Sequence, residues 1–215
     1  MPGLTFSIDH AEAVPFAAAP TIVFRLRVDS QQSGRNIQSV ALRCQILIEA
    51  ARRHYKAEER DRLTDLFGEA DRWSQTLRSL LWTHVSTTVP AFSGSIVTEI
   101  PVPCTFDFNV GAAKYFHAVE TESVPLCFQF SGTIFYADTS GALQIDQIGW
   151  DKEVRFSLSA QVWHDMMDHY YPNSAWLRLR RDAFDRLSEY KRRHGLATWE
   201  EAIERLIPLE KKAAS

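Results

Sequence analysis

Hydrophobic and polar residues alternate along most of this chain, and the period of the pattern changes once, near residue 158. Every second residue is apolar in the segments 22–28, 40–48 and 104–110. Successive side chains of a β-strand point to opposite faces, so this alternation predicts half-buried antiparallel strands. Beyond residue 158 the apolar residues recur at steps of three and four, which predicts amphipathic helices. The sequence therefore predicts a mainly β fold that ends in helices.

The predicted strands are short, and turn residues such as Ser140-Gly141 separate them. They lie at residues 4–8, 21–29, 38–49, 82–90, 94–100, 102–110, 124–131, 132–137, 143–150 and 153–158. Their number and spacing predict an antiparallel two-sheet β-sandwich. Pro101 and Pro103 cannot donate hydrogen bonds to a neighbouring strand, so the strand near them is expected at a sheet edge or with an irregular start.

A helical insertion is predicted inside the sandwich, at about residues 56–81. Its apolar residues recur near helical spacing, and Gly68 divides them into two short helices because glycine readily takes the left-handed conformation that ends a helix. Charges of alternating sign, such as those of Glu59 and Arg60, are typical of a solvated helical face. The insertion is therefore interpreted as a cover for the sandwich or for one of its edges.

A C-terminal helical tail is predicted at about residues 160–208. Pro172 ends its first helix, because proline cannot continue the helical hydrogen bonds. Asn173 or Ser174 can cap the second helix, which carries a continuous apolar stripe. Thr198 and Glu201 have the spacing of a capping box and predict the start of the third helix.

Length and composition fit one globular domain. The 215 residues are 45% hydrophobic and 24% charged, which excludes a disordered chain as an overall description. We expect a single domain over 1–215, with the sandwich core and its insertion at 1–158 and packed C-terminal helices at 159–215. The net charge of −3 gives no broad attraction to nucleic acid. Neither a secretory signal nor a membrane-spanning apolar run is present, so the expected location is the cytoplasm, with no membrane span.

The three cysteines are predicted to be reduced thiols. Cys44 and Cys104 share the apolar phase of their strands, which predicts small core side chains, whereas Cys127 lies in the opposite phase and is the thiol expected to be exposed. Their spacing does not resemble that of a zinc site.

The strongest candidate for a metal site is a group of two histidines and two aspartates in the first tail helix. His164 and Asp168 are four residues apart, as are Asp165 and His169, so all four lie on one helix face. Imidazole and carboxylate groups in this arrangement could hold nickel or zinc. An amphipathic helix with a solvated polar face has the same pattern without any metal. Both interpretations stay open.

The segment that begins the second tail helix is the candidate partner-binding region. Arg178, Arg180 and Arg181 follow Trp176, and arginines beside an aromatic side chain are common anchors of protein interfaces. Acidic residues interrupt the basic run, so a salt-bridged exposed face is favoured over binding of nucleic acid.

Several segments together resemble one uncharacterised bacterial family, a domain of unknown function. They are PTIVFRL at 20–26, ALRC at 41–44, LTDLFG at 63–68, PVPCT at 101–105, FSGT at 130–133 and PNSAWLRLRR at 172–181. Genes of that family tend to lie beside the structural and maturation genes of nickel-iron hydrogenases. The resemblance implies an accessory role around a hydrogenase, and it supplies no catalytic residue. The cysteine pattern does not match the ligands of a nickel-iron centre or an iron–sulfur cluster.

Two classes of function follow from these observations. The first is a non-enzymatic accessory or binding protein that assists the assembly or stability of a nickel-iron hydrogenase or a similar oxidoreductase complex. Its partner would be a hydrogenase subunit or a maturation factor. The alternative is a metal-binding protein or metal-dependent hydrolase that uses the His164, Asp165, Asp168 and His169 face. The sequence contains no nucleophile elbow, phosphate loop, dinucleotide fingerprint or HExxH motif that would point to another enzyme class.

Overall fold

The fold is described by a computed structural model, which covers residues 3–31, 36–105, 109–119, 123–175 and 177–207. Contacts along the backbone divide the chain into two compact units, Met1–Ser174 and Ala175–Ser215. We call the first the β unit and the second the helical unit. The prediction that both form one packed domain stays a prediction.

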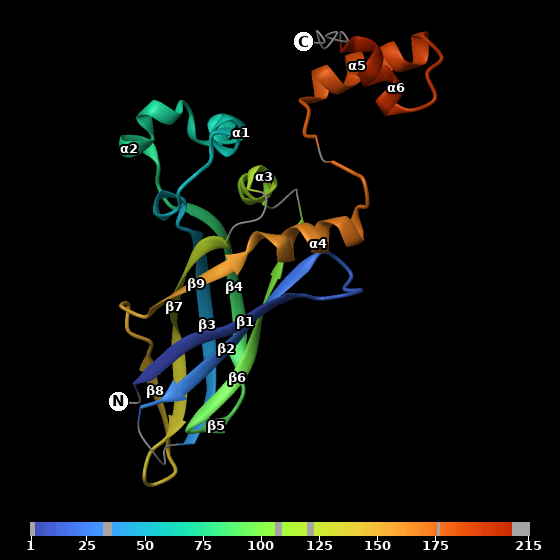
Figure 1. Cartoon of the computed structure of the whole chain (residues 1–215). Helices are drawn as coiled ribbons and strands as arrows, with labels where there is room; N and C mark the ends of the chain where they lie inside the picture. Colours follow the sequence, from blue (N-terminus) through green and yellow to red (C-terminus); the bar gives the residue numbers. More distant parts are fainter. Residues whose placement is uncertain (1–2, 32–35, 106–108, 120–122, 176, 208–215) are drawn as a thin grey trace. The chain divides into compact units, whose positions relative to one another are not determined.

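The β unit contains two antiparallel sheets (Figure 1). The smaller sheet has the order β1-β2-β6, and the larger has β4-β3-β7-β8, with β5 paired to β3 and β9 paired to β7. The strands are β1 Leu4–Ala13, β2 Thr21–Ser30, β3 Asn36–Ile48, β4 Leu80–Val89, β5 Phe92–Ser93, β6 Ser95–Pro103, β7 Ser123–Ala137, β8 Leu143–Gln147 and β9 Glu153–Ser159.

Alternating side chains of the two sheets form the core between them. Phe24 of β2 is fully buried, and its ring meets Phe128 of β7 at 4.9 Å, Phe156 of β9 at 6.0 Å and Trp82 of β4 at 6.1 Å between centroids. Phe6 of β1 stacks on Phe130 of β7 at 4.5 Å. Because rings of the smaller sheet pack on rings of the larger one, the mainly β, two-sheet arrangement predicted from the sequence is confirmed.

The two prolines lie where the sequence predicts them. Pro101 and Pro103 belong to β6, which pairs with β2 at the end of the smaller sheet. An edge strand tolerates proline because no strand lies on its outer side to accept hydrogen bonds from its backbone amides. The segments 94–100 and 102–110, predicted as separate strands, contain one strand that ends at Pro103.

The predicted strand 102–110 is wrong at its C-terminal end, because Val110 begins a helix, α3 Val110–Ala118. Phe106 and Phe108, which carried the alternating pattern, lie outside the described residues. Tyr115 and Phe116 are consecutive and both fully buried. Both residues lie beyond the predicted strand, and a helix that other elements cover on a wide face can bury two consecutive side chains.

The segments 124–131 and 132–137, predicted as two strands, form the single strand β7. Gly132 lies where β7 passes from its pairing with β9 to its pairing with β8. The φ angle of Gly132 is 143°, and a Cβ atom there would clash with the backbone carbonyl of Ala41 in β3. Glycine is therefore required at the point where the strand changes partner.

The helices of the β unit gather at one end of its two sheets, as Figure 1 shows. They are α1 Ala57–Phe67, α2 Trp73–Thr76, α3 Val110–Ala118 and α4 Ala160–Tyr170, with short 3-10 turns at Ala50–Arg52 and Ala70–Arg72. The predicted insertion of about 56–81 thus exists, although β4 already begins at Leu80. An ion pair between Asp65 of α1 and Lys114 of α3 joins two of these helices.

The helical unit contains α5 Arg181–Arg193 and α6 Trp199–Leu206. The second tail helix therefore begins later than predicted, since residues 177–180 are not helical and Asn173, with φ 53°, does not cap it. Thr198 does cap α6 as predicted, because its hydroxyl accepts a hydrogen bond from the Glu201 amide. In the described ranges of both units, no helix combines the length and apolar character that crossing a membrane requires.

Candidate functional site

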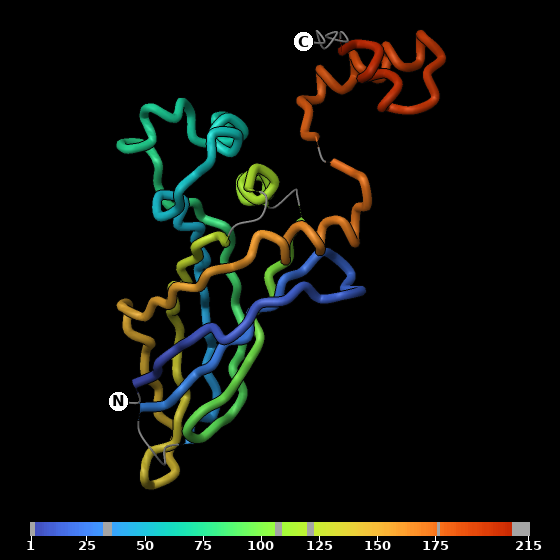
Figure 2. The backbone as a smooth tube through the Cα atoms, viewed as in Figure 1, coloured from blue at the N-terminus to red at the C-terminus, as the bar shows by residue number. Residues whose placement is uncertain are grey.

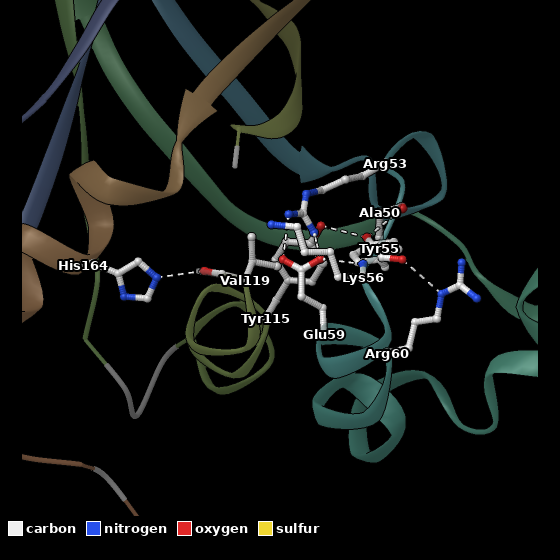
Figure 3. Close-up of polar contacts among 9 residues, drawn as sticks. All are labelled: Ala50, Arg53, Tyr55, Lys56, Glu59, Arg60, Tyr115, Val119 and His164. Atoms are coloured by element: carbon white, nitrogen blue, oxygen red, sulfur yellow. Dashed lines mark hydrogen bonds and ion pairs between the residues drawn. The ribbon is translucent and has the colours of Figure 1, made fainter. Parts of the chain in front are cut away.

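The four residues of the predicted metal site lie on α4 and have different surroundings. His164 Nε2 lies 2.8 Å from the carbonyl oxygen of Val119, just beyond α3 (Figure 3). Asp165 accepts a hydrogen bond from Gln161 at 2.6 Å, and the His169 ring meets the edge of Phe16 at 5.3 Å. Asp168 is exposed on the same helix.

Within the described residues, no three His, Cys, Asp or Glu side chains come together as a metal-binding group. The hydrogen bond of His164 also gives this histidine a role in packing, because it fastens α4 to the end of α3. Nickel or zinc binding by His164, Asp165, Asp168 and His169 therefore stays a prediction.

The opposite face of α4 is apolar and packs on the β unit, as the helical pattern predicts. Trp163 stacks on Phe116 of α3 with centroids 5.5 Å apart, and Met166 is buried. Tyr170 donates a hydrogen bond to the Ala17 carbonyl at 2.9 Å. Figure 2 shows the loop between β1 and β2 beside the end of α4, where this bond holds it.

A buried ion pair lies between the 3-10 turn at Ala50–Arg52 and α1 (Figure 3). Arg53 donates two hydrogen bonds to the Glu59 carboxylate, at 2.8 and 3.1 Å, and the two side chains are 4% and 5% exposed. Burial disfavours the charged form of Glu59, but the hydrogen bonds from Arg53 and from the Lys56 amide outweigh this and lower the pKa of the carboxyl. The pair therefore stays ionised at neutral pH.

Two tyrosines extend this polar group into the core. Tyr55 donates a hydrogen bond from its hydroxyl to the Ala50 carbonyl at 2.8 Å, so the Tyr115 hydroxyl, also 2.8 Å away, donates to Tyr55. The Arg53 guanidinium lies 5.0 Å from the centre of the Tyr55 ring. Burial raises the pKa of both tyrosines, so neither ionises near neutral pH.

A pocket of about 410 Å³ opens beside this network. Its walls come from residues 51–55, from α1 and from residues 70–78, and they include Arg53, His54, Tyr55, Arg60, Trp73 and Arg78. The alternating charges of α1 were interpreted from sequence as a solvated face, and this interpretation missed both the buried pair and the pocket. An available signal was Glu59, whose place in the first helical turn lets it accept a hydrogen bond from Lys56 N at 3.0 Å.

The three cysteines are buried thiols. The prediction of an exposed Cys127 is wrong, because Glu153 of the neighbouring strand β9 lies against it, with Sγ 3.8 Å from the carboxylate. Burial and the nearby Glu153 and Glu49 raise the pKa of Cys127 to about 11, and burial raises the pKa of Cys44 and of Cys104 to about 12. Protonated thiols are poor nucleophiles and poor metal ligands at neutral pH.

The candidate partner-binding residues belong to the helical unit. Arg178, Arg180 and Arg181 are exposed, Arg180 pairs with Asp182 at 3.3 Å, and Trp176 lies outside the described residues. Large apolar side chains of this unit are also exposed. They are Leu177, Leu179, Phe184, Trp199, Leu206 and Ile207.

These features define a mainly β, two-sheet protein with buried thiols, a covered polar network and an amphipathic helical unit. The chain belongs to a family of unknown function, described as "Family of unknown function (DUF6084)", whose model matches residues 1–215. Membership of a family of unknown function, the coarser part of what the sequence resemblance implies, is thus confirmed. No curated protein matches the chain in sequence.

Two solved structures share a limited likeness with the chain. One is a selenomethionine-labelled β-glucosidase from Kluyveromyces marxianus, with 9% identity and a TM-score of 0.28, covering 73% of this chain and 15% of that enzyme. The other is the putative ApaA protein from Bordetella pertussis, with 12% identity and a TM-score of 0.25, covering 73% of this chain and 94% of that protein. The chain thus spans under a fifth of the length of the β-glucosidase.

Proposed function

We propose that the protein is a non-enzymatic accessory protein that binds another protein through its helical unit. The observation that carries this proposal is that α5 and α6 contain many apolar side chains but bury few of them. Ala202 is the one fully buried side chain among the described residues 177–207, although Leu177 is 69% and Phe184 46% exposed. Exposed apolar groups gathered on a small unit are typical of interaction sites.

In the described part of the helical unit, the contacts between α5 and α6 leave most of the apolar side chains exposed. Helices α5 and α6 have 13 and 8 residues, and isolated helices shorter than about 12–15 residues are marginal in water. Inside the unit the Phe184 and Trp199 rings meet at 5.3 Å, and Lys191 lies 5.5 Å from the centre of the Trp199 ring. These few contacts leave the apolar faces available to a partner.

Charge indicates the kind of partner surface that would fit. Residues 175–194 contain seven basic and three acidic side chains, whereas the whole chain has a net charge of −3. Arginines beside exposed Leu177 and Phe184 would combine apolar anchoring with ion pairs. The partner is therefore a protein with an apolar groove bordered by carboxylates.

The partner that we propose is a nickel-iron hydrogenase subunit or one of its maturation factors. This part of the proposal depends on the family resemblance described above, in which the genes lie beside hydrogenase genes. The buried, protonated thiols are consistent with an accessory protein that leaves the redox chemistry to its partner.

The test is a binding measurement between the purified full chain and purified hydrogenase subunits and maturation factors. We expect Phe184→Ala and Arg178→Glu each to weaken binding about tenfold, which corresponds to about 1.4 kcal/mol. Arg43→Glu is the matched control, because Arg43 is an exposed arginine of β3 in the β unit. Circular dichroism of each variant checks that the helices are retained.

Three results would overturn the proposal. The first is equal binding by the helical-unit variants and by Arg43→Glu, or no binding of any hydrogenase protein. The second is a dimer that Phe184→Ala dissociates, which would assign the apolar faces to a second copy. The third is strong amide-exchange protection of α5 in the isolated full chain, which would mean that the chain covers these faces itself.

A further inference from the structure

The pocket beside the Arg53–Glu59 pair has the size of a small-molecule site. Its volume of about 410 Å³ falls within the range of about 300–1,000 Å³ that is usual for such sites. Three separate segments of the chain form its walls, and each is held by specific contacts. Neither the family description nor the proposed partner binding gives this pocket a role.

The charge of the pocket lining is one-sided. Arg53, Arg60 and Arg78 line it together with His54, and its described lining contains no Asp or Glu. Glu59, which does not line the pocket, neutralises the charge of Arg53 through their ion pair. Arg60 and Arg78 therefore supply the positive charge that a ligand would meet, in a chain whose net charge is negative.

Each of these exposed arginines donates a hydrogen bond to a backbone carbonyl. Arg60 Nε donates to the Tyr55 carbonyl at 3.1 Å, as Figure 3 shows, and Arg78 Nη1 donates to the Leu77 carbonyl at 3.2 Å. Each bond uses one edge of a guanidinium, whose planar fork has further N–H donors for an oxyanion. A guanidinium carries the charge and the planar donor fork that a phosphate or carboxylate group accepts, and the pocket lining offers two of them.

The rest of the lining is mostly apolar, and specific contacts hold its Trp73 side chain. Trp73 donates its indole N–H to the Gly68 carbonyl at 2.8 Å, and its ring meets Tyr55 at 5.4 Å and Phe67 at 5.9 Å. Leu77 follows it in the lining. A fixed indole beside two guanidiniums can hold the apolar part of a ligand whose acidic group lies at the arginines.

We propose that this pocket binds a small organic anion that carries a phosphate or carboxylate group on an apolar or aromatic body. Arg60 and Arg78 bind the acidic group, and Trp73 and Leu77 contact the body. The buried Arg53–Glu59 ion pair holds the part of the wall that lies between the two arginines and these apolar residues. The function is recognition of a metabolite-sized ligand, separate from the protein partner of the helical unit.

The test is calorimetric titration of the full chain with phenyl phosphate, benzoate, inorganic phosphate and phenol at low salt. Phenyl phosphate or benzoate should bind saturably, and the stronger of the two identifies the acidic group. Inorganic phosphate and phenol should each bind at least about tenfold more weakly, since each offers only one half of the ligand. Added salt should weaken the binding of the charged probes.

Variants locate the site. Arg60→Gln and Arg78→Gln should each weaken binding about tenfold or more, because each removes one charge-assisted contact. Arg72→Gln is the matched control, since Arg72 is an exposed arginine of the neighbouring 3-10 turn and does not line the pocket. Equal weakening by all three variants, or no saturable binding of either organic acid by the wild-type chain at millimolar concentration, would overturn the proposal.

Discussion

The β unit and the helical unit both have amphipathic sequences but bury their apolar faces to very different extents. In the β unit, alternate residues of two sheets face each other, so side chains such as Phe24 and Phe128 are fully buried. In the helical unit, Phe184 and Leu206 are about half exposed, and Ala202 is the fully buried side chain of its described part. An amphipathic pattern therefore predicts which face is apolar, and only the surrounding structure decides what covers it.

This difference in burial also supports the separate functions that we propose for the two units. The β unit buries many large side chains between its own sheets and helices, and each contributes about 1.5–3 kcal/mol to stability. The helical unit keeps its apolar surface available, which is the property that we propose for partner binding. The arginine-lined pocket belongs to the β unit, and we propose that it binds a small ligand there.

The largest expected contrast comes from removing one ring in each unit. Phe24→Ala deletes the ring that joins β2 to three strands of the larger sheet. We expect it to lower the free energy of unfolding of the β unit by about 3–5 kcal/mol, from lost burial and the cavity that remains. Urea unfolding followed by tryptophan fluorescence and circular dichroism measures the change.

Phe184→Ala is the matched change in the helical unit. Its ring is 46% exposed, so we expect the free energy of unfolding of the β unit to change by less than about 0.5 kcal/mol. A loss comparable to that of Phe24→Ala would show that the Phe184 ring is covered in solution, and the contrast between the units would be wrong.

The strands of the β unit were predictable because their period is two residues and one face is buried. Ile22, Phe24, Leu26 and Val28 are all buried, as the alternation in 22–28 requires. Helix α3 was missed because the alternating pattern of 104–110 continues up to its first residue. Tyr115 and Phe116 lie beyond that predicted strand, and the sequence pattern does not place beside them the rings of α1 and α4 that contact them.

The candidate sites were less predictable than the fold, for a physical reason. The His164 to His169 face follows from helical spacing alone, so the sequence places its four residues correctly on one helix. The pocket needs residues 51–55, Arg60 and residues 70–78 to fold back on one another. Likewise, the spacing of Arg53 and Glu59 in the sequence is ordinary for charged residues. Only the folded structure shows that the two form a buried ion pair.

The second prediction concerns this buried pair and its dependence on pH. Glu59→Gln leaves the Arg53 guanidinium buried without its counter-charge, so we expect the β unit to lose about 3–5 kcal/mol of stability at pH 7. The folded-state pKa of Glu59 lies below its ordinary value of 4.5. The stability that the carboxylate contributes is therefore present above pH 4.5 and is lost as the pH falls through the folded-state pKa.

The difference in unfolding free energy between wild type and Glu59→Gln should accordingly stay constant from pH 7 to about pH 5 and shrink below it. Glu58→Gln removes an exposed carboxylate from the same helical turn and should change stability by less than about 0.5 kcal/mol. If the difference in unfolding free energy between wild type and Glu59→Gln did not depend on pH, the charge of Glu59 would not be what stabilises its pairing with Arg53.

The smallest expected effect lies at the start of α6 and tests whether the two units unfold separately. Thr198 accepts a hydrogen bond from the Glu201 amide at 3.2 Å, and the Glu201 carboxylate accepts one from the Ala197 amide at 2.8 Å. Thr198→Ala removes one half of this capping box, so we expect a loss of about 1 kcal/mol in the stability of α6. Amide exchange should quicken in α6 and stay unchanged in β3 and β7, because helix capping is a local interaction. Faster exchange in those strands would show that the helical unit shares the cooperative unfolding of the β unit, and its apolar faces would then belong to the folded core instead of to a partner.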